Sequence, residues 1–569
     1  MLLNRKVFDA VRVKQLTVLV MAVLFSVGAG AQDIGEITKQ KPFEIHGAAS
    51  ATVGYYLSSG FNNTRKPYTY SIMAAPTISL YGIQIPFNFT FTEGSKSLKN
   101  PFAQFGINPY WKWIKVYAGW TNMKWSPTTL NGKTFLGIGV EINPSLFRFG
   151  AMYGRFNPAI KENLFGPAPQ QPQYKRRGFG FKIGVGNEAN YFDLIFLKAK
   201  DVAGSIPVPT DTLNQLDYNP MENAVFGIMS YQSFLKKKLT WQLDGSVSAI
   251  TRNLNSQLLD LGTGIGTRFL KVVMPPRLST SYAWAAHTNI SYKGEKITLS
   301  FDYNRLQPEY QSMGLDYIMN DQEKISLVQS FPAAKKKVFV SLNEFFQRDD
   351  LNNRKAAKTN RTGLTAGVNV NPTQKFGMAI NYTNYITFQQ KGLKPINDST
   401  KIFQLQQTVV FAPHYLIVNA KMVHNINAAL TYSRMDDLNK VTSKYSKNST
   451  VNANLGYSLS VNKIALAVSP SFNVLYSKGT SFELLNVGPT IAVSKSFWKN
   501  KINTAVSFTF TAGRNNGQWN SKVLNNSISL GYRIDGHHSL KLTNYVMASF
   551  AATGDRREYK GDLTYSYSF

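Results

Sequence analysis

The side chains that most often carry out chemistry are few in this sequence, and they do not gather into a known motif. Six histidines occur, and only His537 and His538 are adjacent. Neighbouring residues of a strand point to opposite faces, so this pair does not suit a single metal ion. The pair follows Asp535 and Gly536, a turn-forming dipeptide. We therefore interpret the four residues as a solvated tight turn.

Motifs for catalysis are also missing. The sequence has no His-Glu-x-x-His, no Gly-x-Ser-x-Gly and no glycine-rich phosphate loop. The acidic pairs Asp349-Asp350 and Asp436-Asp437 fall short of the several converging oxygens that calcium needs. Zero cysteine excludes disulfides, thiolate metal sites and cysteine nucleophiles. We expect no enzyme, no cofactor and no metal; a composite catalytic site built from separate strands is the alternative.

The net charge of +31 would ordinarily suggest nucleic acid or an anionic surface as a partner. Here the lysines and arginines are scattered along the chain. Their short runs at 175–177, 236–238 and 335–337 fall in expected loops or turns. We therefore expect no nucleic-acid partner, and we interpret the cations as solvated loop ends near anionic lipid headgroups.

Residues 1–31 have the pattern of a secretory signal peptide. Arg5, Lys6 and two further cations precede an apolar run from Leu16 to Val27, which is short for a membrane-spanning helix. Ala29-Gly30-Ala31 fits a small-x-small cleavage site. The alternative is an uncleaved membrane anchor. After residue 31 no run of about 18 apolar residues follows, so we expect no other membrane helix.

The sequence after residue 31 is best explained by long β-strands. Apolar and polar residues alternate strictly over 83–92, 240–249, 297–304, 451–460 and 502–511. Period two places each set on its own face of a strand. The polar face is mostly Ser, Thr, Asn and Gln, which is typical of a transmembrane barrel with lipid outside and a polar lumen inside. The candidate lumen-facing residues are Asp244, Asp302, Asn452, Asn454, Asn503 and Thr509.

The connections between these strands alternate between short and long. Outer-membrane barrels place short turns on the periplasmic side and long loops outside. The expected fold is therefore all-β: a single large antiparallel transmembrane β-barrel of about 26 strands, within a range of 22–28, with both termini periplasmic. The boundaries around 101–121 and 402–436 are the weakest. Residues 32–42 form a short periplasmic segment, and residues 43–569 form the barrel.

The C-terminal strand carries a more specific pattern. Tyr565, Tyr567 and Phe569 alternate with polar residues, Phe569 is last, and Asp562 begins the pattern. This resembles the C-terminal assembly signal of Gram-negative outer-membrane β-barrel proteins, although Thr564 stands where a glycine is usual. The resemblance is to the class and names no subfamily. It implies a place in the outer membrane, contact with its lipid, and recognition by the barrel-assembly machinery through strand addition.

Two subfamilies are disfavoured. TonB-dependent transporters carry a plug of roughly a hundred residues before the barrel, and the expected first strand at Phe43 leaves no room for one. The lipopolysaccharide-export barrel carries a periplasmic domain and paired cysteines, which we do not find here.

The long loops bear on function. An unplugged barrel of this size would leak, so we expect loops 157–177, 200–221 and 252–280 to fold inward and narrow the pore. Loop 252–280 is markedly apolar, and docking on a partner protein would bury it equally well. The first hypothesis is a porin-like channel or transporter for hydrophilic solutes, with basic loops favouring anions. The alternative is a non-catalytic structural or interaction subunit of an outer-membrane secretion, assembly or attachment complex.

Prolines inside expected strands lack a donor for the ladder of hydrogen bonds. They mark bulges or strand ends, or else a weakened seam that opens sideways to lipid. They are Pro76, Pro86, Pro413, Pro470 and Pro489.

Overall fold

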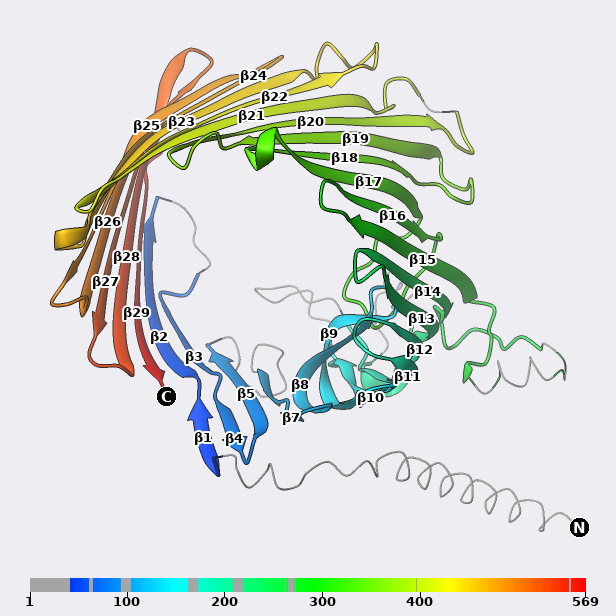
Figure 1. Ribbon diagram of the computed structural model, residues 1–569. Coiled ribbons are helices and arrows are strands. Elements are labelled where there is room, and N and C mark those ends of the chain that lie inside the picture. Colours follow the sequence, from blue (N-terminus) through cyan, green and yellow to red (C-terminus); the bar gives the residue numbers. More distant parts are fainter. Residues whose placement is uncertain are drawn as a thin grey trace, which may run out of the picture.

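A computed structural model describes residues 41–60, 65–93, 104–161, 172–207 and 218–569, apart from 261, 263, 265–270, 272, 396, 552 and 553. These residues form one antiparallel sheet that closes into a wide ring (Figure 1). In the described part of the chain, no helix has the length and apolar character needed to cross a membrane. The expected signal peptide, residues 1–31, and most of the expected segment 32–42 lie outside the described residues.

The first half of the ring contains β1 (Phe43–His46), β2 (Ala48–Ser59), β3 (Tyr68–Ala74), β4 (Thr77–Leu80), β5 (Ile83–Thr92), β6 (Gln104–Ile107), β7 (Tyr110–Trp111), β8 (Ile114–Ser126), β9 (Leu130–Ile142), β10 (Phe147–Asn157), β11 (Arg176–Gly186), β12 (Tyr191–Asp201), β13 (Glu222–Phe234), β14 (Leu239–Thr251) and β15 (Thr280–Lys293). The second half contains β16 (Thr298–Leu306), β17 (Gln322–Ala333), β18 (Val338–Arg348), β19 (Ala357–Val370), β20 (Phe376–Lys391), β21 (Phe403–Val418), β22 (Met422–Asp437), β23 (Asn448–Val461), β24 (Leu466–Gly479), β25 (Glu483–Phe497), β26 (Ile502–Asn515), β27 (Gln518–Arg533), β28 (His538–Ala551) and β29 (Arg556–Ser568). Short 3-10 turns are η2 (Ala203–Ser205), η3 (Ala334–Lys336) and η4 (Asn462–Ile464).

Three interruptions divide what are otherwise single strands, so these 29 segments make a closed barrel of 26 strands. Gly47 separates β1 from β2, with a φ of 143° and a Cβ position only 2.5 Å from the Ala75 carbonyl oxygen. Pro76 separates β3 from β4, and Pro109 separates β6 from β7. A proline cannot donate to the ladder, so the pairing stops and resumes there. The expected strand number of about 26 is confirmed.

The other prolines of the sequence pattern stay within strands. Pro86 pairs with Thr77, Pro470 with Ile491, and Pro489 with Phe472. Beside Pro413 the pairing of β21 with β22 lapses between Phe411 and His414. The prolines therefore mark local irregularities of the ladder, and a laterally opening seam stays a prediction.

The ends of the chain close the barrel. Strand β2 pairs with β29 from Ala48–Ser568 to Ser59–Arg557. Beyond that register, the backbone amides of Gly47 and Phe569 each donate to the other residue's carbonyl at 3.1 Å. Because this pairing joins the first and last strands, the sheet has no free edge in the described part of the chain.

The two faces of the sheet differ as the alternation predicts. On β11, Phe179, Phe181 and Ile183 are exposed, whereas Gly180 and Lys182 between them are buried. On β14, Val247 is 52% exposed, while Ser246 and Ser248 are buried. The apolar set thus faces outward and the polar set faces the interior, as lipid outside and a polar lumen inside require.

Candidate functional site: the inner wall of the barrel

The end of the β8–β9 hairpin lies inside the ring, against the inner face of β12–β14 (Figure 1). At its tip, the Thr128 hydroxyl donates to the Asp244 carboxylate at 2.5 Å, and the Ser246 hydroxyl donates to Thr128 Oγ1 at 2.8 Å. Asp244 and Ser246 belong to β14, on the face opposite the exposed Val247. These bonds hold the tip of the hairpin inside the lumen.

The loop between β16 and β17, residues 307–321, covers this hairpin. The Tyr310 hydroxyl donates to the Thr128 carbonyl oxygen at 2.7 Å and lies 2.6 Å from Ser246 Oγ. The Ser312 hydroxyl donates to the Thr129 carbonyl oxygen at 2.6 Å. Burial raises the pKa of Tyr310, so its hydroxyl stays protonated and available as a donor. We call the hairpin end (126–130) together with loop 307–321 the inner shelf.

An apolar core underlies the inner shelf. Leu130 and Phe135 of β9 are fully buried, and Met313 of the loop packs in the same cluster. The remaining members come mainly from the inner faces of β8–β14: Tyr117, Met123, Trp125, Met152, Phe156, Ile195, Leu197, Ala199, Val225 and Ile250. Burial of this much apolar surface is the main stabilising contribution to the inner shelf. This side of the lumen is therefore packed like a soluble domain.

Charged side chains next to the core are paired. Arg148 donates to both Asp193 oxygens at 2.7 and 3.0 Å, and its guanidinium lies 4.1 Å from the centre of the Tyr191 ring. Lys182 lies 3.6 Å from Glu141. Asp193 and Lys182 are almost fully buried, and an unpaired charge there would be costly, so the pairs hold this wall in one arrangement.

Farther around the wall, the inward cations without a carboxylate partner among the described residues include two that flank the same residue of β18. Lys324 of β17 and Arg361 of β19 both lie next to Gln347 of β18 in the register, on the face opposite Ile325 and Phe346. The Lys324 ammonium lies 5.0 Å from the centre of the Phe345 ring. The lumen beside β17–β19 therefore carries uncompensated positive charge.

The six residues predicted to face the lumen all lie at inward positions of the register. Asp244 holds the hairpin, and Asp302 lies 2.7 Å from His287 Nε2. Asn454 donates to Asn473, Asn503 accepts from Ser496, and the hydroxyls of Thr509 and Thr490 are 3.0 Å apart. Asn452 is exposed opposite Leu475. The six residues are spread around the wall and form no common site.

The predicted histidine turn is present. The backbone amides of His537 and His538 both donate to Asp535 Oδ1 at 2.7 Å, and these bonds lower the pKa of the Asp535 carboxyl. Across the described residues, no group of three or more His, Asp or Glu side chains is placed to hold a metal ion.

In the predicted assembly strand, Asp562 accepts from Lys560 at 2.9 Å, and the Tyr565 hydroxyl lies 2.6 Å from His538. The Tyr567 and Phe569 rings are 5.3 Å apart. All four residues of the pattern therefore lie at the closing seam of the barrel.

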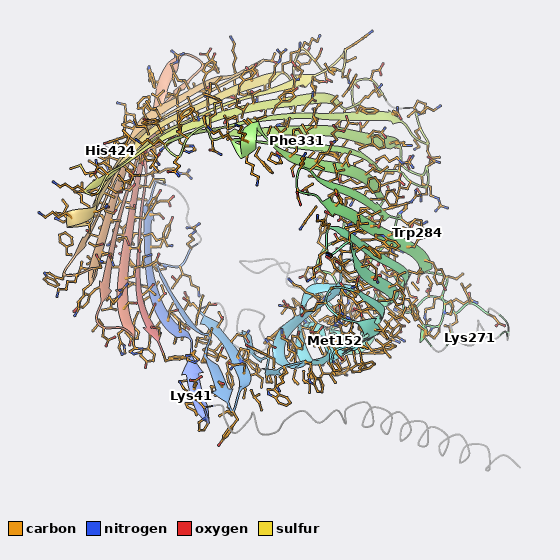
Figure 2. The ribbon with its side chains drawn as sticks, viewed as in Figure 1. Lys41, Met152, Lys271, Trp284, Phe331 and His424 are labelled. Atoms are coloured by element: carbon orange, nitrogen blue, oxygen red, sulfur yellow. The ribbon has the colours of Figure 1, made fainter. Side chains whose placement is uncertain are left out.

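One expectation about the loops is wrong. The described part of loop 252–280 does not enter the lumen. Met274 and Val273 pack on the outer face, against Phe196 and Ala224, and Lys271 lies outside the ring of strands (Figure 2). Apolar loop residues can be buried by the outer wall as well as by the mouth of the barrel. Residues 162–171 and 208–217 of the other two loops lie outside the described residues.

No protein-family model matches the chain, and no curated protein matches it. Solved structures similar to it include OccAB3 of Acinetobacter baumannii (12% identity, 62% of this chain, 93% of that one, TM-score 0.31) and OprD of Pseudomonas aeruginosa (10%, 62%, 91%, 0.30). Another is the translocation pore of the P pilus usher PapC (9%, 92%, 99%, 0.33).

TM-scores of this size carry nothing about solute, partner or activity to the present chain. Its closed 26-strand barrel with an apolar outer face nevertheless has the architecture of the Gram-negative outer-membrane β-barrel class. The resemblance read from the C-terminal strand is confirmed at the level of that class.

Proposed function

We propose that the barrel is an outer-membrane channel for hydrophilic solutes with a preference for anions, and that it is not an enzyme. The observation that carries this proposal is the inner wall. Beyond the inner shelf, from β17 onward, it is lined by neutral polar side chains and by the uncompensated cations Lys324 and Arg361. A polar wall allows hydrated solutes to pass, and fixed positive charge raises the local concentration of anions.

The experiment is a reversal-potential measurement in planar bilayers across a potassium chloride gradient. The wild-type protein should conduct and prefer chloride. The K324Q/R361Q variant should conduct with a clearly reduced preference. The matched control, K495Q/K522Q, removes the same charge from outward positions of the register and should leave selectivity unchanged. Silence of the wild type, or equal selectivity of both variants, would refute the proposal.

The orientation is part of the proposal. The long loops would face outward, and both termini would lie in the periplasm, since outer-membrane barrels place their short turns on that side. Protease added outside intact cells should cut within the long loops and leave an epitope tag in the short turn 294–297 untouched. Cleavage at that turn would show that the barrel has the opposite orientation.

Loop 252–280 supports the second candidate, a structural or interaction subunit. Leu258 and Leu259 are 55% and 38% exposed, on a loop whose described part lies outside the ring. Exposed apolar residues of this kind suit a protein partner. Affinity purification from detergent extracts should then yield a stoichiometric partner that an L258S/L259S variant loses. Purification of the wild type alone would reject this candidate.

A further inference from the structure

The outer face of the barrel carries a row of cations at the long-loop end. Arg155 of β10 pairs in register with Arg177 of β11, and Arg177 pairs with Lys200 of β12. All three lie on the outward face, in line with the exposed Tyr153 and Phe179. Like charges directly opposite each other on neighbouring strands destabilise a sheet. The row therefore calls for a counter-charge.

The charge on the chain itself supplies too little compensation. Glu222 of β13 lies 3.0 Å from Lys198 and 3.4 Å from Lys200, so this one carboxylate already serves two lysines. Arg177 makes no ion pair with any carboxylate that the structure describes. Arg155 Nε and Nη2 are buried and have no hydrogen-bond partner in the described part of the chain.

Loop 252–280 forms a groove with two members of this row, Arg177 and Lys200. The segment around Val273 packs on the outer face, where the Lys198 ammonium donates to the Val273 carbonyl oxygen at 2.5 Å. Arg277 follows and lines a groove of about 600 Å³ together with Arg177, Lys198 and Lys200, and its guanidinium also donates to the Ser256 carbonyl oxygen. Asp201 lines the groove too, but both of its carboxylate oxygens accept from Arg176. Tyr153 and Phe179, 53% and 43% exposed, line the same groove on the side toward the middle of the barrel wall.

We propose that this groove binds the phosphorylated headgroup of a lipid in the leaflet at the long-loop end of the barrel. Cations lie at the strand ends and aromatic rings lie deeper, which matches a lipid with an anionic head above its acyl chains. Guanidinium groups suit phosphate oxygens in particular, because their donors are arranged as a planar fork. The proposal needs the long-loop end to face the outer leaflet, and it does not depend on conduction through the lumen.

The test uses the full-length protein, purified in a neutral detergent and titrated with diphosphoryl lipid A. Binding is followed by native mass spectrometry and by the shift in Tm. Wild type should bind saturably. The R177Q/K200Q variant should bind at least tenfold more weakly, and so should R277Q, which changes the loop side of the groove. The control K293Q/K296Q removes two cations at a short turn at the opposite end and should bind like wild type.

Two further ligands separate the possible sources of phosphate. Dephosphorylated lipid A should bind weakly to every variant, and inorganic phosphate at the same concentration should not raise the Tm. Without lipid, R177Q/K200Q should be at least as stable as wild type, because it removes like-charge repulsion. Equal binding of lipid A by wild type, R177Q/K200Q and R277Q would overturn the proposal. Full stabilisation by inorganic phosphate, or equal binding of the dephosphorylated lipid, would also overturn it. Conductance measured on the same variants reports separately on the channel.

Discussion

Tyr310 fastens the inner shelf, so its removal should widen the lumen. Its side chain is fully buried, and its hydroxyl contacts the Thr128 carbonyl oxygen and Ser246 Oγ. In Y310F the Ser246 hydroxyl keeps Thr128 Oγ1, whereas the Thr128 carbonyl loses a donor. Leaving a buried acceptor unsatisfied costs about 2 kcal/mol, which shifts the ratio of docked to undocked loop by roughly 30-fold. In Y310A a cavity is added, at about 3–5 kcal/mol for truncating an aromatic ring.

Single-channel recording in planar bilayers measures the outcome. Y310F should raise the occupancy ratio of a larger conductance level by roughly 30-fold, and Y310A should occupy that level most of the time. Tyr317, in the same loop, is 80% exposed, so Y317F and Y317A serve as matched controls and should behave like wild type. A folded Y310A variant with wild-type conductance would show that the inner shelf does not narrow the conducting path.

The pH dependence of the same level follows from the raised pKa of Tyr310. A group whose pKa is higher in the docked state contributes fully below its unperturbed pKa of about 10, and its contribution is lost as the pH rises above that value. The larger level of the wild-type channel should therefore become more frequent above that pH. In Y310F this dependence should flatten. An identical alkaline rise in both proteins would assign the effect to another group.

Three further outcomes follow from the described geometry. G137A should fail to assemble, because its Cβ would lie 2.1 Å from the Tyr153 carbonyl oxygen. The heat-resistant band in gel electrophoresis reports this, and G531A, whose nearest atom would be 3.8 Å away, should assemble normally. D193N leaves Arg148 without its carboxylate and should lower the free energy of unfolding by about 3–5 kcal/mol; R148Q added to it should restore part of the loss, and strict additivity would contradict the pairing. The folded protein lowers the pKa of Asp535, so the carboxylate stabilises its turn fully when the pH is above the ordinary carboxyl pKa. The turn should loosen as the pH falls through the lowered pKa of the folded state. Hydrogen exchange of the His537 and His538 amides, which donate to Asp535, should speed up in that window in wild type and be fast at all pH values in D535A. Equal exchange in the two proteins would rule out the capping role.

The barrel could be predicted because its signal is local and repeated. Many of the long strands carry the period-two pattern, and turns such as Tyr81-Gly82, both with positive φ, are marked by residue type. The breaks at Pro76 and Pro109 were harder to foresee, since a proline that ends a strand and one that stays within it, such as Pro86, look alike in sequence.

The inner shelf could not be predicted, because it depends on contacts between residues far apart in the chain. Thr128 and Asp244 are 116 positions apart, and Thr128 and Tyr310 are 182 apart. Loop 307–321 is short and unremarkable in composition beside the apolar loop 252–280, yet the shorter loop is the one that enters the lumen. The apolar composition of loop 252–280 indicated that its side chains would be buried against another surface. It did not indicate which surface, because the outer wall and the mouth of the barrel can both bury apolar side chains.

The inner shelf is attached along one arc of the wall, from β8 to β17, and that asymmetry has a consequence for traffic through the barrel. A plug suspended at the centre would leave an annulus in which a solute meets the same surroundings at every angle. An obstruction joined to one side leaves a crescent, and whatever crosses must travel along the far arc. A solute that crosses would then pass hydroxyl groups, amides and a few cations in the order in which they line that arc.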